Sequence, residues 1–313
     1  MLRLAIVSPC YNEEAVLEAS TARLTALLDG LSAEGKISAD SYILYVNDGS
    51  KDGTWPLIES LHASNRYVKG VSLSHNSGHQ NAIMAGMMTA REMCDGCITI
   101  DADLQDDISC IPQMIEAWEE GSDVVYGVKV SREGDGAMKK FTAEAYYKML
   151  KAFGVDTIFN HADFRFLSRR VLDALAQYPE RNLYLRALIP QIGFKSSTVE
   201  DHIGKREAGE SKYTLRKMLR LAVDGITSFT EKPLYLIIAA GIVFILISLA
   251  IAVYVIVSLA VGHVVAGWSS LMLSLWFIGG MVMVAVGITG LYIGKIYSEV
   301  KRRPLYNIEK FLG

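Results

Sequence analysis

CITIDAD, residues 97–103, is a short apolar run that ends in two carboxylates. A run of this kind is typical of a buried strand, and open α/β sheets bind their ligands at the carboxyl ends of strands. Asp101 and Asp103 are therefore expected at a ligand site. Carboxylates one residue apart can share a hard divalent cation such as Mg²⁺ or Mn²⁺, which neutralises phosphate groups. The alternative is that these residues only cap a turn or a helix.

Similar apolar runs recur through the first part of the chain and alternate with helical patterns. The predicted strands are Leu2–Ser8, Tyr42–Val46, Val68–Leu73, Cys97–Ile100 and Asp123–Val128. The predicted helices are Glu13–Leu31, with Asn12 as its candidate N-cap, Thr54–Leu61, Gly78–Met93 and Ser109–Trp118. This alternation predicts an α/β fold with a doubly wound parallel sheet and right-handed crossovers.

Polar motifs follow three of the predicted strands. They read PCYNEE at residues 9–14, NDGSKDGT at 47–54 and DADLQ at 101–105, and we expect them to converge on one crevice. No G-x-G-x-x-G follows the first strand and no G-x-x-x-x-G-K-[ST] occurs, which argues against a dinucleotide-binding dehydrogenase and a P-loop enzyme. A nucleotide would then be held by carboxylates and a metal ion.

The apolar residues of the chain are concentrated near its C-terminus. Hydrophobic residues make up 51% of the 313 residues, and the mean hydropathy of +0.24 is high for a wholly soluble protein. Residues 234–294 contain no Asp, Glu, Lys or Arg, and these 61 residues suffice for two bilayer crossings of about 20 residues each. We expect transmembrane helices at about 234–261 and 270–294. A pair of internal core helices is the alternative.

Charge flanks this apolar stretch and predicts its orientation. Residues 205–232 carry a net charge of +3 and residues 295–313 another +3, which leaves −9 for residues 1–204. Because basic segments stay on the cytoplasmic side, both termini are expected in the cytoplasm, and no signal peptide precedes the acidic part. Basic segments beside a span favour a lipid bilayer as a partner, whereas nucleic acid is excluded for so acidic a domain.

These patterns predict four regions along the chain. A cytoplasmic catalytic domain covers residues 1–204, a basic juxtamembrane segment 205–232, a two-helix hairpin 233–294 and a basic cytoplasmic tail 295–313. Two segments, Ala137–Phe153 and Leu215–Phe229, have amphipathic helical patterns that could place them in the headgroup region. For the first of them, packing in the domain core is an equal alternative.

The four cysteines all fall in the predicted cytoplasmic part. Because thiols are kept reduced in the cytoplasm, we expect no disulfide among Cys10, Cys94, Cys97 and Cys110. The CDGC sequence at residues 94–97 has redox spacing, but it lies at a predicted helix-to-strand turn and no second cysteine pair is present to build a zinc site. We interpret these thiols as buried packing.

Five motifs in order, followed by two apolar spans, resemble glycosyltransferase family 2, and specifically its polyprenyl-phosphate sugar synthases of the dolichol-phosphate mannose synthase and bactoprenol glucosyltransferase type. The motifs are SPCYNEE at 8–14, NDGS at 47–50, DADLQ at 101–105, DFR at 163–165 and REAGESK at 206–212. Each motif is weak alone, but the ordered set is specific and covers nearly the whole chain. The resemblance implies a Rossmann-like GT-A domain followed by amphipathic interface helices and the transmembrane hairpin.

The resemblance also implies roles for individual residues. The implied nucleotide-sugar site is Pro9, Tyr11, Glu13, Asp48, Asp101 and Ala102, and the implied ligands of Mg²⁺ or Mn²⁺ are Asp103 and Gln105. The candidate catalytic residues are Asp163, Asp101 and Arg165, and the candidates for binding the acceptor's phosphate are Arg132, Arg206, Ser211 and Lys212. The alternatives are a plain hairpin turn at residues 47–50, capping by Asp103 and a solvated charge run around Arg132.

Asp163 matches the carboxylate that is the candidate base in this family. A phosphate monoester has its second pKa near 6, so an acceptor of this kind is mostly a dianion at neutral pH. We therefore expect Asp163 chiefly to orient the acceptor, the sugar or Arg165, with base catalysis secondary.

The predicted reaction is a metal-assisted, inverting transfer of a sugar of the glucose or N-acetylhexosamine type. The expected donor is a nucleotide-sugar, UDP-linked, and the expected acceptor is undecaprenyl phosphate at the cytoplasmic face of a bacterial inner membrane. The product would serve glycosylation of the cell envelope, such as lipopolysaccharide. The alternatives are transfer to another lipid or polysaccharide acceptor and a non-catalytic membrane scaffold of the same fold. Small residues between Gly279 and Gly294 would also permit a homo-oligomer.

Overall fold

The computed structural model describes residues 1–129, 161–202, 227, 230–261 and 267–313. The chain divides into two compact units, each with its own internal contacts. The first comprises Met1–Tyr147, Asp156–Tyr213 and Arg303–Gly313, and the second comprises Lys148–Val155 and Thr214–Arg302. The two units are therefore described separately.

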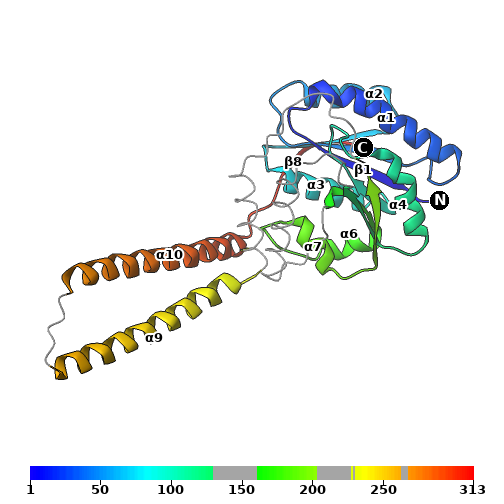
Figure 1. The fold of residues 1–313 in the computed structure, drawn as a ribbon. Helices are drawn as coiled ribbons and strands as arrows, with labels where there is room; N and C mark the ends of the chain where they lie inside the picture. The colour runs from blue at the N-terminus through cyan, green and yellow to red at the C-terminus, as the bar shows by residue number, and fades with distance from the viewer. Residues whose placement is uncertain (130–160, 203–226, 228–229, 262–266) are drawn as a thin grey trace. The chain divides into compact units, whose positions relative to one another are not determined.

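A mixed sheet of eight strands organises the first unit (Figure 1). Its strands are β1 (Leu4–Cys10), β2 (Tyr42–Asn47), β3 (Val68–Leu73), β4 (Gly96–Thr99), β5 (Val124–Lys129), β6 (His161–Ser168), β7 (Ser196–Asp201) and β8 (Ile308–Leu312). They lie in the order β7-β5-β6-β4-β1-β2-β3-β8. The four predicted strands β1 to β4 are present and mutually parallel where they pair.

The expectation of a wholly parallel sheet is wrong beyond β4. Strand β6 lies antiparallel between β4 and β5, so that β5 does not follow β4 as the next parallel neighbour. The alternating segment from His161 to Ser168 is long enough to pair with both neighbours, and Phe164 and Phe166 in it are fully buried. This insertion brings the chain after residue 160 back to the centre of the sheet.

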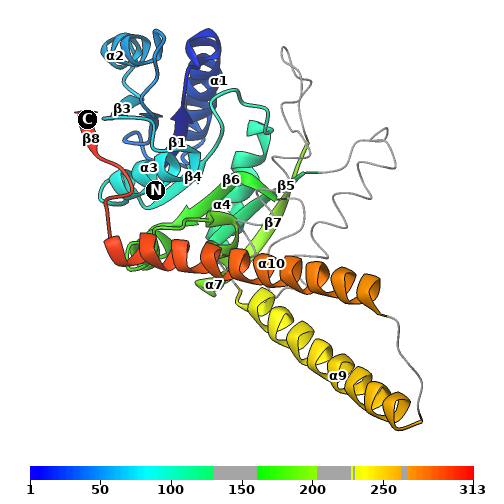
Figure 2. The ribbon, with the colours of Figure 1, turned by 90° about the vertical axis from the view of Figure 1, so that its left-hand side faces the viewer.

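Helices cover both faces of this sheet. They are α1 (Glu14–Ala33), α2 (Thr54–Ser64), α3 (His79–Arg91), α4 (Ile111–Glu119), α6 (Arg169–Leu175) and α7 (Leu185–Gln191), with a 3-10 turn at Ile108–Cys110. Helices α1 and α2 lie on one side and α3 on the other (Figures 1 and 2). Gly86 of α3 faces Val7 and Val46, and a Cβ atom there would come within 2.3 Å of a Val7 methyl group. The absence of a side chain at Gly86 thus lets α3 pack closely on β1 and β2.

The start of α1 differs from its prediction by one residue. Glu13 rather than Asn12 occupies the N-cap position, and Asn12 has a positive φ of 57°. The Asn12 side chain instead accepts a hydrogen bond from the Lys51 backbone N–H at 2.9 Å. Asn tolerates the left-handed region better than most residues, so it serves here in a turn that ties the first strand-end loop to the second.

The chain returns to the first unit after its apolar helices. Strand β8 pairs antiparallel with β3, and Leu312 packs against the core. The Lys310 ammonium lies 3.4 Å from Glu59 Oε1 and over the Trp55 ring. The sequence analysis placed residues 295–313 in a separate tail, whereas the structure joins their last part to the sheet.

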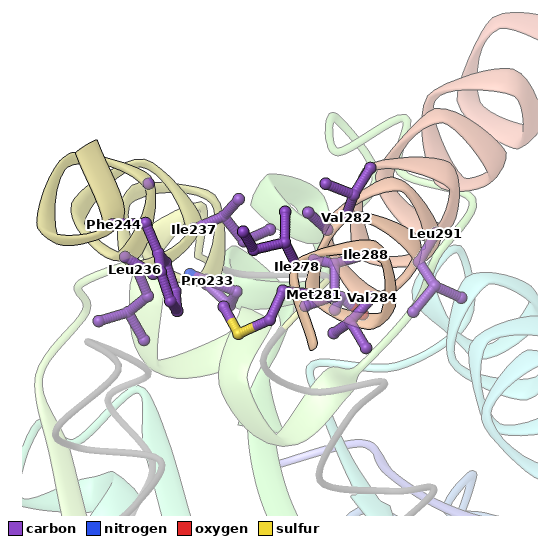
Figure 3. A pocket seen from close by; sticks show the side chains of 14 residues that line it. Pro233, Leu236, Ile237, Phe244, Ile278, Met281, Val282, Val284, Ile288 and Leu291 are labelled. Carbon is purple, nitrogen blue, oxygen red and sulfur yellow. The ribbon is translucent and has the colours of Figure 1, made fainter. Parts of the chain in front are cut away.

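The second unit contains two long apolar helices, α9 (Lys232–Ala260) and α10 (Trp268–Lys301). Both are long and apolar enough to cross a membrane, and their most apolar segments are exposed. An apolar groove of about 580 Å³ runs between them (Figure 3) and is lined by residues that include Ile237, Phe244, Ile278 and Met281. The Tyr292 hydroxyl donates to the Thr230 carbonyl oxygen at 2.6 Å. The predicted amphipathic segment 137–153, and 215–229 apart from Thr227, lie outside the described residues.

Candidate functional site

A polar cavity of about 310 Å³ lies at the carboxyl ends of β1, β2 and β4. The residues that line it are Pro9, Cys10, Tyr11, Glu13, Asp48, Asn76, Gly78, His79, Ala82, Asp101, Ala102 and Asp103. Every residue predicted to bind the nucleotide-sugar is in this set. The three strand-end motifs therefore meet in one crevice, as parallel strands of a doubly wound sheet require.

Asp48 is used to fix the start of α3. Its carboxylate is buried and accepts hydrogen bonds from the backbone N–H groups of Ser77 at 2.6 Å and Gly78 at 3.0 Å. Burial raises the pKa of Asp48, and these two N–H groups only partly oppose that rise. Gly49 beside it has a φ of +64°, and a Cβ atom there would come within 2.5 Å of the Asn76 nitrogen. The Asn-Asp-Gly-Ser turn is thus both a tight turn and the anchor of the loop at residues 74–78.

The loop after β4 presents Asp103 and Gln105 side by side. Ala102 is buried, and its carbonyl oxygen accepts a hydrogen bond from Ser20 Oγ at 2.7 Å, which fixes the loop from below. The Gln105 side-chain amide donates to the exposed Asp103 carboxylate. A half-turn of the Gln105 amide would place its oxygen beside the Asp103 oxygens. One carboxylate and one amide oxygen fit a hard cation whose shell is completed by diphosphate and water.

No group of three or more His, Cys, Asp or Glu side chains suited to a metal is present in the described part of the chain. Asp103 and Gln105 together offer fewer oxygen atoms than the complete shell of a divalent cation needs. All four cysteines are buried, as their interpretation as packing residues predicted, and burial raises the pKa of Cys94 to about 12. Their thiols are inert packing groups.

A second network anchors the far end of the same loop. Lys129 Nζ lies 2.9 Å from an oxygen of the buried Asp106 carboxylate, and Asp201 Oδ1 accepts the Asp107 backbone N–H at 2.8 Å. Burial raises the pKa of Asp106 to about 7, with Lys129 opposing the rise. These contacts join the loop to β5 and β7, so Asp101 to Asp107 is held at both ends.

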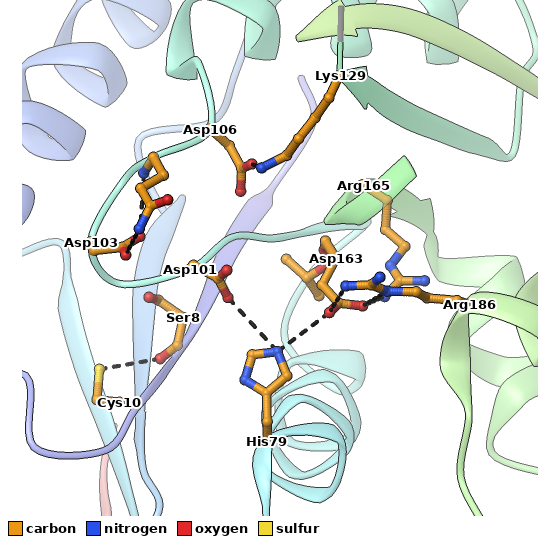
Figure 4. A network of polar contacts seen from close by, with 12 residues as sticks. Ser8, Cys10, His79, Asp101, Asp103, Asp106, Lys129, Asp163, Arg165 and Arg186 are labelled. Atoms are coloured by element: carbon orange, nitrogen blue, oxygen red, sulfur yellow. Dashed lines mark hydrogen bonds and ion pairs between the residues drawn. The ribbon is translucent and has the colours of Figure 1, made fainter. Parts of the chain in front are cut away.

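Asp163 lies at the centre of a buried charge cluster (Figure 4). Arg165 Nη2 donates to Asp163 Oδ1 at 2.6 Å, and Arg186 Nη2 donates to Asp163 Oδ2 at 3.0 Å. Arg165 is fully buried, and the Thr99 hydroxyl donates to the Asp163 carbonyl oxygen, which fixes β6 against β4. The predicted pair Asp163 and Arg165 is therefore brought together, with Arg186 as a third member.

The charges around Asp163 keep it ionised. Burial alone would raise its pKa, but Arg186, His79 and Arg165 together hold the pKa well below its usual range. A carboxylate in this state is a weak base and a strong hydrogen-bond acceptor. The cluster can therefore orient neighbouring groups without exchanging protons near neutral pH.

His79 connects this cluster with the cavity. Its Nε2 atom lies 3.4 Å from Asp163 Oδ2 and 3.8 Å from Asp101 Oδ1 (Figure 4). Asp101 is half exposed, and desolvation raises its pKa. His79 opposes that rise, while Asp163 and Asp103 add to it. One imidazole thus lies between the two carboxylates that were predicted as catalytic.

His79 and Arg186 were missed by the sequence analysis. Arg186 lies in LYLRALIP, where a lone cation within an apolar run signals a buried partner. His79 lies in HNSGHQN, a polar loop with no recognisable spacing to a second ligand. The predicted phosphate-binding residues Arg132, Arg206, Ser211 and Lys212 lie outside the described residues.

Comparisons with known proteins agree on a family. The model of "Glycosyl transferase family 2" matches residues 5–176. An uncharacterized glycosyltransferase of Bacillus subtilis, YkoT, is 45% identical over 98% of this chain and 91% of its own length. The SfII prophage-derived bactoprenol glucosyl transferase of Shigella flexneri is 36% identical over 99% of this chain and 98% of its own length.

Among solved structures, the mannosyltransferase PcManGT from Pyrobaculum calidifontis, in complex with GDP-Man and Mn²⁺, matches with a TM-score of 0.48 and 15% identity. This match covers 96% of this chain and 87% of that chain. The family model alone covers more than half of the chain, and the two relatives extend the similarity over nearly all of it. The chain belongs to glycosyl transferase family 2.

Proposed function

We propose that this protein transfers a sugar from a nucleotide-sugar to a polyprenyl phosphate at the cytoplasmic face of a membrane. The observation that carries the proposal is the polar cavity at the ends of β1, β2 and β4, with Asp48 on one side and Asp101 and Asp103 on the other. Relatives named bactoprenol glucosyl transferase, similar over nearly the full chain, support the acceptor. We further propose a UDP-linked donor of the glucose or N-acetylhexosamine type, and the word glucosyl in the names of these relatives supports a glucose donor.

In the proposed reaction, an oxygen of the acceptor's phosphate attacks the anomeric carbon of the sugar. The bond from that carbon to the diphosphate breaks, and the nucleoside diphosphate leaves with its electron pair. Asp103 and Gln105 would hold Mg²⁺ or Mn²⁺, which when bound supplies charge neutralisation for the diphosphate. Pro9, Tyr11, Glu13 and Asp48 hold the nucleoside, and Asp101 and Ala102 lie at the sugar.

Asp163 acts in this scheme as an orienting group. Its pKa is held well below the usual range, and the phosphate acceptor is already mostly a dianion at neutral pH. Arg165 and Arg186 hold the carboxylate in a single position. Measuring the rate of Asp163→Asn against pH tests this role. A persistent defect at every pH is expected, whereas a defect that disappears at high pH would identify Asp163 as a general base.

The membrane part of the proposal rests on α9, α10 and the strand that follows them. Both helices are long, apolar and exposed. Strand β8 belongs to the same sheet as β1, and this supports our proposal that the chain before α9 and after α10 lies on one side of the membrane. An even number of crossings satisfies this condition, and a hairpin of two helices is the simplest case. Basic residues before α9 and after α10 favour the cytoplasmic side.

The test uses the purified full chain in lipid nanodiscs. Radiolabelled UDP-glucose, UDP-N-acetylglucosamine and GDP-mannose are each incubated with undecaprenyl phosphate or diacylglycerol. The mass of the lipid product is measured by mass spectrometry. We expect label in a polyprenyl-phosphate-sugar, loss of transfer on chelation, and recovery with Mg²⁺ or Mn²⁺. Transfer that is indifferent to polyprenyl phosphate would refute the acceptor. The Asp103→Asn variant, which retains its neighbours, serves as the matched inactive control.

A further inference from the structure

His79 differs from the other groups around the two catalytic carboxylates in touching both of them. Its Nε2 atom lies between Asp163 Oδ2 and Asp101 Oδ1, at 3.4 and 3.8 Å. Both distances exceed an ordinary N–H···O hydrogen bond, so the ring is shared between the two carboxylates rather than committed to one. It is also a residue of the cavity wall. The imidazole therefore lies where the polar cavity and the Asp163 charge cluster meet.

The two carboxylates depend on His79 to very different degrees. Asp163 keeps Arg165 and Arg186 as partners whatever His79 does. For Asp101, His79 is the one ion-pair partner within the described ranges of the chain. Asp163 and Asp103 both repel the Asp101 carboxylate. Loss of the ring would consequently leave Asp163 in place, while Asp101 would keep only the longer-range attraction of Lys129.

The position of His79 is itself set from the nucleoside side of the cavity. His79 is the first residue of α3, immediately after Gly78 and Ser77, whose N–H groups are held by Asp48. The Asn81 side chain donates to the Ser77 carbonyl oxygen at 2.7 Å and closes the same turn. A cationic or N–H-donating ring is not favoured at the positive end of a helix dipole, so the two carboxylates provide the reason for it here.

We propose that His79 is a positioning residue that sets the Asp101 carboxylate at the donor's sugar and couples it to the Asp48 turn. The inference rests on the proposed function, because it assigns Asp101 to the nucleotide-sugar. The proposal predicts that removing the ring changes donor kinetics more than acceptor kinetics. Removing the ring weakens the handling of the donor, while Asp163, held by Arg165 and Arg186, keeps its position.

Steady-state kinetics of His79→Ala, His79→Gln and His79→Lys in nanodiscs test this prediction. For His79→Ala we expect kcat/KM for UDP-glucose to fall by about 10-fold, within the range of interaction energies between members of one charge network, with the KM for undecaprenyl phosphate within about 3-fold of wild type. His79→Lys, which keeps a cationic donor, should recover most of the loss, and His79→Gln part of it. His75→Ala, at an exposed residue outside the cavity, is the matched control.

A double-mutant cycle identifies the carboxylate through which His79 acts. In an Asp101→Asn background, His79→Ala should have almost no further effect, whereas in an Asp163→Asn background its effect should persist. Equal changes in donor and acceptor KM, no rescue by Lys or Gln, or a full effect in the Asp101→Asn background would overturn the proposal. A fall in Tm common to all three His79 variants would likewise show a structural role.

Calorimetric binding of UDP-glucose without acceptor separates this inference from the proposed function. If wild type binds the donor but transfers no sugar to undecaprenyl phosphate, the proposed acceptor is wrong and His79 is still tested by the binding constant. If wild type transfers sugar and His79→Ala binds UDP-glucose as tightly as His75→Ala, the reaction stands and the role of His79 is refuted.

Discussion

Two buried carboxylates of the site, Asp48 and Asp163, are stabilised in opposite ways. Asp48 accepts two backbone N–H groups, and its pKa is still raised by burial. Asp163 is also buried, yet Arg186, His79 and Arg165 outweigh the burial and lower its pKa. Burial decides the direction of the pKa shift at Asp48, where two backbone N–H groups and the charges of His75 and His79 only partly oppose it, whereas the cations around Asp163 outweigh burial there. The Asp48 carboxylate is therefore held by backbone N–H groups, and the Asp163 carboxylate by cationic side chains.

The largest expected effect comes from a substitution in the charge cluster around Asp163. Asp163→Asn should lower the free energy of unfolding by about 3–5 kcal/mol at pH 7, because it leaves Arg165 and Arg186 without their buried partner. Chemical or thermal unfolding of the full chain in detergent measures this difference.

The effect of Asp163→Asn should also depend on pH. The folded pKa of Asp163 lies below that of the unfolded chain, about 3.9, so its contribution is complete above that value. It is lost as the pH falls through the folded pKa. The gap in stability between wild type and variant should therefore shrink below about pH 4, and a gap that stays constant would contradict the charged state assigned to Asp163.

A smaller loss of stability is expected at Asp48, whose partners are backbone N–H groups. Asp48→Asn keeps one acceptor oxygen but turns an amide N–H₂ group toward the second backbone N–H, so we expect a loss of about 1–3 kcal/mol. The same unfolding measurement applies, with donor binding followed in parallel. A loss as large as that of Asp163→Asn would mean that charge, rather than hydrogen bonding, holds the Asp48 turn.

Gly78→Ala isolates the backbone contribution to that turn. Gly78 has a φ of +93°, and no atom lies within 4 Å of the position that a Cβ would take. The expected cost of about 1–2 kcal/mol is therefore conformational strain without a steric clash. An unchanged Tm would show that the turn relaxes freely, and the Asp48 hydrogen bonds would then carry its whole stability.

The smallest effect should come from an ion pair outside the site. Asp173 lies 3.1 Å from Arg169 one helical turn away, and both side chains are substantially exposed. Asp173→Ala should change the free energy of unfolding by about 0.5 kcal/mol or less, because solvent screens the pair. A larger loss would mean that solvent-exposed ion pairs also stabilise this protein. The contrast with the buried Asp163 cluster would then be weaker.

The sequence predicts the Asp48 turn and the loop after β4 better than the charge cluster around Asp163. Asp48 and Asp101 to Asp103 lie at the ends of buried strands, so local patterns suffice to place them in one crevice. Asp163 and Arg165 were reached only through resemblance to a family. Their partner Arg186 lies on α7, and its contact exists only because β6 enters the sheet beside β4. Nothing in the spacing of residues along the chain encodes that insertion.

Strand β8 was missed for a similar reason. Its sequence, IEKFL, is short and contains both Glu309 and Lys310, so it has no clear apolar alternation. The strand is defined by its partner β3, which is far away along the chain. By contrast, an uninterrupted apolar stretch needs no partner to be recognised, and α9 and α10 contain the predicted stretch, although α10 continues to Lys301 instead of ending at Gly294.

The pairing of β8 with β3 has a consequence for biosynthesis. A ribosome delivers Val68–Leu73 early, but Ile308–Leu312 emerges only after both apolar helices have been made. During that interval β3 is an open sheet edge, the kind of surface that invites pairing with other chains. The catalytic sheet is therefore completed only after the helical hairpin has left the ribosome, so that a chain arrested before that point lacks its last strand.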